Sequence, residues 1–91
     1  MNSPINKLQQ LMTITMEECG ELTQQCSKIM RKYKDFDDIE EDQRRKLIEE
    51  AGDVYCMLEL MVEHKVCKWL DLEDRANVKK KKLEKWSELI D

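Results

Sequence analysis

Residues 5–33, INKLQQLMTITMEECGELTQQCSKIMRKY, carry the most regular pattern in this chain. Apolar or small side chains recur along them at alternating spacings of three and four, at Ile5, Leu8, Met12, Thr15, Cys19, Leu22, Cys26, Ile29 and Tyr33. Because an α-helix turns once every ~3.6 residues, these positions form a stripe along one helix face. The pattern predicts one continuous amphipathic helix that begins at Ser3 and Pro4, as N-cap and first-turn proline, and ends near Lys34.

The same helical period returns twice further along the chain. A polar connection at residues 35–42, DFDDIEED, precedes a second predicted helix from roughly residue 42 to 65 and a third that Asp71 caps. The connection has the alternating Asp of a calcium loop, but Glu40 stands where that loop requires glycine, which excludes an EF-hand. The predicted fold is all-α, with three or more helices in a single domain over residues 1–91.

The short length of the chain predicts a partner subunit. The 91 residues are 40% charged and 41% hydrophobic, and they include two glycines and one proline. A chain of this size buries a small fraction of its surface, and two shorter helices cannot cover the stripe of a much longer one. We therefore expect a homodimer or homotetramer, in which two long antiparallel helices form a four-helix-bundle core completed by oligomerisation.

Charge, hydropathy and cysteine usage limit the possible partners. The formal net charge of −4 argues against a nucleic-acid-binding protein. No apolar run approaches the ~20 residues that span a bilayer, and the N-terminus lacks the apolar stretch of a signal peptide. No Cys-x-x-Cys pair occurs, and the cysteines follow the apolar segments, so we expect reduced thiols in the core at Cys19, Cys26, Cys56 and Cys67. These features predict a cytoplasmic protein that binds neither membrane nor nucleic acid.

Two six-residue strings, EECGEL at 17–22 and EEAGDV at 49–54, share one pattern of Glu, Glu, a small residue, Gly, an acid and an aliphatic residue. They contain both glycines of the chain, although glycine inside a helix costs ~1 kcal/mol relative to alanine. We therefore expect two backbones to approach each other closely at Gly20 and Gly52.

The acids of these strings predict a cation site. At about 100° per residue, Glu50 falls within the apolar sector of its helix, where a carboxylate is costly unless it is paired or bound to a metal. Three further acids lie at or near the edges of the stripes: Glu18, Glu21 and Asp53. Acid-rich helix faces are usually just solvated, but the duplicated pattern and the inward Glu50 favour a site. Clustered carboxylates repel each other, and oxygen ligands suit a hard cation, magnesium or manganese.

The motifs Glu17-Glu18-x-x-Glu21 and Glu50-x-x-Asp53, separated by 28 residues, resemble the EExxE and ExxD signature of the MazG-like all-α nucleotide pyrophosphohydrolases. The resemblance covers most of the chain. It implies Mg²⁺-dependent hydrolysis of nucleoside or deoxynucleoside triphosphates to monophosphate and pyrophosphate, as housekeeping of the nucleotide pool. It also implies a set of metal ligands, with Mn²⁺ as a possible substitute for Mg²⁺: Glu18, Glu21, Glu50 and Asp53.

The resemblance also implies a mechanism, with Glu17 and Glu49 as neighbours that tune or orient the ligands, while helix geometry suggests two of the substrate contacts. Glu17 or Glu21 is the expected base that orients or deprotonates the attacking water. Lys28 and Lys32 follow Glu21 on its own helix face, where they either meet the phosphates or pair with nearby acids. Relatives place an asparagine and a lysine on the helix after the second motif, which points to Asn77 and to Lys81 or Lys80.

Two other classes of helical protein share features with this chain. A di-iron carboxylate bundle requires Glu-x-x-His, but Met61 stands three residues before His64, which excludes it. A non-catalytic helical oligomerisation or adaptor protein is the remaining alternative. It accounts for the amphipathic helices but not for the paired acid motifs.

Overall fold

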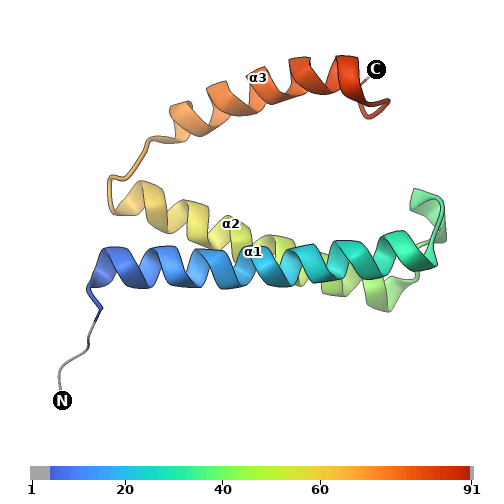
Figure 1. Ribbon diagram of the computed structural model, residues 1–91, viewed down its shortest axis with the longest axis horizontal. Helices are drawn as coiled ribbons and strands as arrows, with labels where there is room; N and C mark the ends of the chain where they lie inside the picture. The colour runs from blue at the N-terminus through green and yellow to red at the C-terminus, as the bar shows by residue number, and fades with distance from the viewer. Residues whose placement is uncertain (1–4, 91) are drawn as a thin grey trace. The chain divides into compact units, whose positions relative to one another are not determined.

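The computed structural model describes residues 5–90, which form three α-helices and a short 3₁₀ helix (Figure 1). The helices are α1 (Lys7–Lys32), η1 (Phe36–Asp38), α2 (Glu41–Glu63) and α3 (Trp69–Trp86). No strand occurs within this range, so the predicted all-α class is confirmed. The chain divides into two compact units, one that ends at Leu60 and one that begins at Met61.

The first helix begins with a reciprocal capping box. Asn6 Oδ1 accepts a hydrogen bond from the Gln9 N–H at 2.9 Å, and Gln9 Oε1 accepts one from the Asn6 N–H at 3.0 Å. These bonds satisfy N–H groups that the start of a helix leaves unpaired. The predicted start at Ser3 and Pro4 lies outside the described residues. The end of α1 at Lys32 is close to the predicted one.

The helices α1 and α2 run antiparallel and face each other through positions spaced alternately by three and four residues (Figure 1). On α1 the buried or half-buried side chains at this spacing are Leu11, Thr15, Glu18, Leu22, Gln25 and Ile29. On α2 they are Gln43, Leu47, Glu50, Val54 and Met57. A mean spacing of ~3.5 residues is that of a coiled-coil seam.

The seam contains a series of positions that recurs every seven residues and includes all of its buried members, and the chemistry changes from one position to the next. Leu11 and Met57 are 7% and 5% exposed, and within residues 5–90 they are the only buried apolar residues. Seven residues further along α1 lies Glu18, and seven residues earlier on α2 lies Glu50. Acids therefore occupy positions that a helix pair normally fills with apolar side chains.

A second step of seven leads to a pair of amides. Gln25 is 3% exposed, and its Nε2 donates to Gln43 Oε1 at 3.0 Å and lies 3.3 Å from the Gln43 carbonyl oxygen. Buried polar groups are normally hydrogen-bonded, and a polar pair inside a helix seam favours one register of the two helices. This amide pair supports the register that brings Glu18 and Glu50 to the same level.

The predicted close approach of two backbones at the glycines is wrong. A Cβ added to Gly20 or Gly52 would meet nothing within 4 Å. Gly20 follows Glu18 by two residues, and Gly52 follows Glu50 by two. At about 100° per residue, this separation places each glycine on the far side of its helix from the seam.

Within the single chain the cysteines do not lie in a buried core, contrary to the prediction. All four thiols are free, but three are exposed and one is half-buried: Cys19, Cys26, Cys56 and Cys67. The helix α2 packs over the face of α1 that contains Glu18 and Gln25, at one edge of the predicted stripe. The adjacent edge, with Cys19 and Cys26, is left open because the stripe is wider than one facing helix covers.

The second helix ends with the two hydrogen bonds of a Schellman motif. The Val66 N–H donates to the Met61 carbonyl at 2.9 Å, and the Lys65 N–H donates to the Val62 carbonyl at 3.0 Å. Lys65 takes φ 62°, a left-handed conformation that usually requires glycine. The helix therefore stops at Glu63, close to the predicted end.

The third helix begins at Trp69, and its cap differs from the predicted one. Asp71 lies inside the first turn rather than at the N-cap, and its Oδ2 accepts a hydrogen bond from the Lys68 N–H at 2.9 Å. The acid still satisfies an N–H at the helix start. None of the helices built from residues 5–90 combines the length and the apolar composition needed to cross a membrane.

Candidate metal centre

Four carboxylates, two from each helix, converge between α1 and α2. One oxygen atom from each lies within 4.8 Å of the other three, in a cluster of Glu18, Glu21, Glu50 and Asp53. The two acids on each helix are three residues apart, so they lie on one face about one turn from each other. The structure thus brings together the four side chains that the sequence singled out as ligands.

Glu50 is the most enclosed member of this carboxylate cluster. It is 7% exposed, as its place in the apolar sector of α2 predicted. Its Oε2 atom is buried without a hydrogen-bond partner, and so is Oε2 of Glu18. A buried carboxylate oxygen without a partner is costly because it has lost its water and gained nothing in return. Two such atoms in one cluster mark a position suited to a cationic ligand.

Burial and mutual repulsion raise the pKa values of two of these carboxyls. The pKa of Glu18 is raised chiefly by burial, and then by the charges of Glu21 and Asp53. The pKa of Glu50 is raised chiefly by burial, and then by the neighbouring carboxyl of Glu21, while Lys46 opposes the shift. The cluster therefore resists carrying four negative charges, and a bound cation would relieve this cost.

The donor set and its dimensions fit magnesium. At ~2.1 Å per bond, opposite oxygen ligands of one octahedral Mg²⁺ lie about 4 Å apart. The 4.8 Å limit of the cluster is close to that span, and it also suits two ions about 3.5–4 Å apart. The four ligand atoms are all carboxylate oxygens, without the sulfur or imidazole nitrogen that zinc favours.

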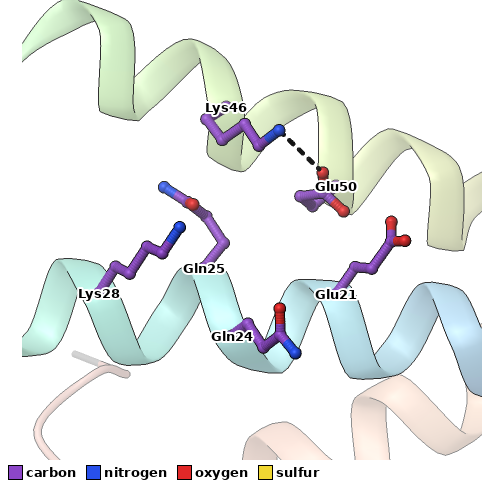
Figure 2. A pocket seen from close by; sticks show the side chains of 6 residues that line it. All are labelled: Glu21, Gln24, Gln25, Lys28, Lys46 and Glu50. Carbon is purple, nitrogen blue, oxygen red and sulfur yellow. Dashed lines mark ion pairs between the residues drawn. The ribbon is translucent and has the colours of Figure 1, made fainter.

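A polar hollow of about 270 Å³ opens beside the carboxylate cluster (Figure 2). Both helices contribute to its lining: Glu21, Gln24, Gln25, Lys28, Lys46 and Glu50. Glu21 on α1 extends toward Glu50 on α2, and Lys28 also extends from α1 toward α2 (Figure 2). Lys28, which was expected to meet phosphates, thus shares one hollow with two of the expected metal ligands.

Lys32 does not line this hollow. Its Nζ lies 3.2 Å from Oε1 of Glu40, and 5.5 Å from the centre of the Tyr33 ring. Glu40 also accepts a hydrogen bond from the Tyr33 hydroxyl at 3.1 Å. Of the two roles considered for Lys32, the structure favours the ion pair over the phosphate contact.

The remaining predicted site residues lie outside the carboxylate cluster. Glu17 and Glu49 are exposed neighbours of cluster acids. Asn77, Lys80 and Lys81 lie on α3, in the second unit, and all three are exposed.

Gln25 and Lys46 belong to the hollow but were missed in the sequence. Gln25 follows Glu21 by four residues, and Lys46 precedes Glu50 by four. Residues four apart lie on the same helix face, so this spacing from the motif acids could have identified both. Lys46 Nζ lies 3.7 Å from Oε1 of Glu50.

No family model matches this chain, and no curated protein or solved structure matches it either. The likeness to MazG-like enzymes therefore depends on the two motifs alone.

Proposed function

We propose that this protein is a magnesium-dependent nucleoside triphosphate pyrophosphohydrolase of the MazG-like kind, which produces a monophosphate and pyrophosphate. The observation that supports this most is the environment of Glu50. This acid is 7% exposed, one of its oxygens has no partner, and three other carboxylates face it. Such an arrangement is costly in a purely structural helix pair and useful in a cation site.

In this proposal the acids of both helices hold the cation: Glu18, Glu21, Glu50 and Asp53. When bound, Mg²⁺ or Mn²⁺ supplies positive charge to phosphate oxygens and lowers the pKa of a nearby water. Lys28, across the hollow, neutralises further phosphate oxygens. The resemblance adds contacts from Asn77 and from Lys81 or Lys80.

Glu21 is our preferred base for the attacking water. It is exposed, it belongs to the carboxylate cluster, and it lines the hollow in which a substrate would lie. Glu17 is the other candidate, and it lies outside the cluster. A comparison of Glu21→Gln with Glu17→Gln at saturating Mg²⁺ decides between them, since only the base variant should lose the dependence of its rate on deprotonation.

The proposal includes assembly into a homodimer or homotetramer that completes a four-helix bundle. Within residues 5–90 only two apolar residues are buried, whereas fourteen large hydrophobic residues are 38% to 83% exposed. Examples along the chain are Leu8, Met30 and Trp86. A second copy of the chain would remove much of this apolar surface from water.

A non-catalytic oligomerisation or adaptor protein remains the second candidate, because the exposed apolar side chains favour it equally. A screen of canonical and modified nucleoside triphosphates separates the two functions. We expect monophosphate and pyrophosphate in equal amounts with Mg²⁺, and neither product when the metal is chelated. Absence of both products for every nucleotide, together with no detectable Mg²⁺ binding, would leave the adaptor as the better account.

A further inference from the structure

Lys46 forms an ion pair with the most enclosed acid of the carboxylate cluster. Its Nζ lies 3.7 Å from Oε1 of Glu50, which is longer than the ~2.8 Å of a good charge-assisted hydrogen bond. The Lys46 side chain is 52% exposed, while that of Glu50 is 10% exposed. The lysine is therefore held by charge alone, and its ammonium can turn away while the acid stays in place.

Lys46 also lies in the hollow that contains Lys28 (Figure 2). The two lysines come from different helices, Lys46 from α2 and Lys28 from α1. Both lysines line the same polar hollow of about 270 Å³ as two acids of the carboxylate cluster, Glu21 and Glu50. A polyphosphate chain needs cations around several of its oxygens, and two ammonium groups beside a cation site would provide them.

We propose that Lys46 exchanges partners during substrate binding: it neutralises Glu50 in the metal-free protein, and it contacts a phosphate oxygen once a divalent cation occupies the carboxylates. This inference rests on the proposed function, which supplies both the cation and the polyphosphate. A cation and Lys46 compete for the same carboxylate of Glu50. Lys46 therefore weakens the binding of the cation alone and strengthens the binding of a polyphosphate in the presence of that cation.

Calorimetric titration of Lys46→Gln tests these opposite effects. With Mg²⁺ alone, the variant should bind about two- to fivefold more tightly than the wild type, because a partly exposed ion pair no longer competes. With inorganic pyrophosphate at saturating Mg²⁺, it should bind about tenfold more weakly, because a hydrogen bond to a charged oxygen is lost. Lys46→Arg should restore most of the pyrophosphate affinity.

Arg45→Gln is the matched control. Arg45 is exposed on the same helix, one position before Lys46, and it does not line the hollow. Like Lys46→Gln, the Arg45→Gln substitution removes one positive charge. It therefore measures how much a general change in charge alters the binding of Mg²⁺ and of pyrophosphate. We expect less than about a twofold change in either affinity, since the charge is exposed and screened. Lys46→Met, which keeps the aliphatic stem, replaces Lys46→Gln if circular dichroism shows that the latter has lost helix.

Each pattern of affinities has one meaning. A Lys46→Gln variant that leaves either affinity at the wild-type value, or that changes both in the same direction, overturns the partner exchange and leaves the proposed function intact. Wild-type protein that binds Mg²⁺ but not pyrophosphate also overturns the exchange. Wild-type protein that binds no Mg²⁺ overturns the proposed function and the exchange with it.

Discussion

Gln25 on α1 donates its side-chain amide to Oε1 of Gln43 on α2 at 3.0 Å, one seven-residue step away from Glu18 and Glu50. The amides and the acids occupy successive enclosed positions of one helix seam. A hydrogen bond between the amides restricts how the helices can slide past each other. The geometry of the carboxylate cluster thus depends on a pair of residues that does not belong to it.

Gln25→Ala should lower the free energy of unfolding by about 1–3 kcal/mol, because oxygens of Gln43 lose their donor in an enclosed place. Urea denaturation measures the change. Gln24→Ala, next along the helix and exposed, should change it by less than about 0.5 kcal/mol. Replacing both Gln25 and Gln43 by Leu should restore stability, since no polar atom is then left unpaired. Equal losses for Gln24→Ala and Gln25→Ala would contradict a structural role for the amide pair.

The raised pKa values of Glu18 and Glu50 predict that the metal-free protein loses stability as pH rises. The folded state holds these protons more strongly than the unfolded state, whose carboxyls titrate near 4.5. The free-energy cost of ionising these two carboxyls in the folded protein is absent below about pH 4.5. It grows as pH rises toward and through the folded-state pKa values, and it is complete above them. Thermal melts of the metal-free protein, with a chelator present, measure this effect. We expect these two acids to lower Tm as pH rises from about 4.5 through their folded-state pKa values.

Magnesium should reverse this trend, because the ion binds the deprotonated carboxylates. The increase in Tm on addition of Mg²⁺ should be small near pH 4.5 and should grow toward neutral pH. The double variant Glu18→Gln/Glu50→Gln should lose both effects. A Mg²⁺-induced increase that is constant with pH would place the ion elsewhere on the protein.

Cys26→Glu should dissociate the proposed assembly. Cys26 is exposed on the edge of the α1 stripe that α2 leaves uncovered, where a second copy of the chain would pack. A charge buried in such an interface is costly, whereas in a monomer an exposed substitution changes stability by less than about 0.5 kcal/mol. Analytical ultracentrifugation should show a smaller species for Cys26→Glu. Thr13→Glu, exposed on the opposite side of α1, is the control and should keep the wild-type size.

The sequence predicted the helices and the inward Glu50 because both follow from a period of ~3.6 residues, which one chain reveals without reference to its surroundings. Prediction from the sequence failed for the burial of individual residues, because burial depends on which part of a wide stripe the neighbouring helix covers. The periodicity could not show that α2 packs beside Gln25 rather than Cys26. Nor could it show that Lys65 adopts a positive φ, because tertiary context can impose that conformation on a residue other than glycine.

Glu50→Gln should abolish pyrophosphate release while the fold persists. Loss of a residue that only supports a ligand costs about 10- to 100-fold in metal affinity or activity, so loss of a direct ligand should exceed about 100-fold. The metal-free variant should melt at the same temperature as the wild type or higher, because one charge leaves a cluster in which burial and repulsion already raise the pKa of this acid. Addition of Mg²⁺ should raise its Tm much less than that of the wild type.

Glu49→Gln is the matched control, since it removes the same charge one position earlier from an exposed side chain outside the carboxylate cluster. It should lose far less activity than Glu50→Gln and should keep most of the response of Tm to Mg²⁺. If Glu50 were instead a structural partner of Lys46, Glu50→Gln would lower the melting temperature of the metal-free protein, and its activity would follow the folded fraction. The two accounts predict opposite signs for the metal-free melting shift. A Glu50→Gln protein that melts lower yet hydrolyses normally would rule out the metal centre.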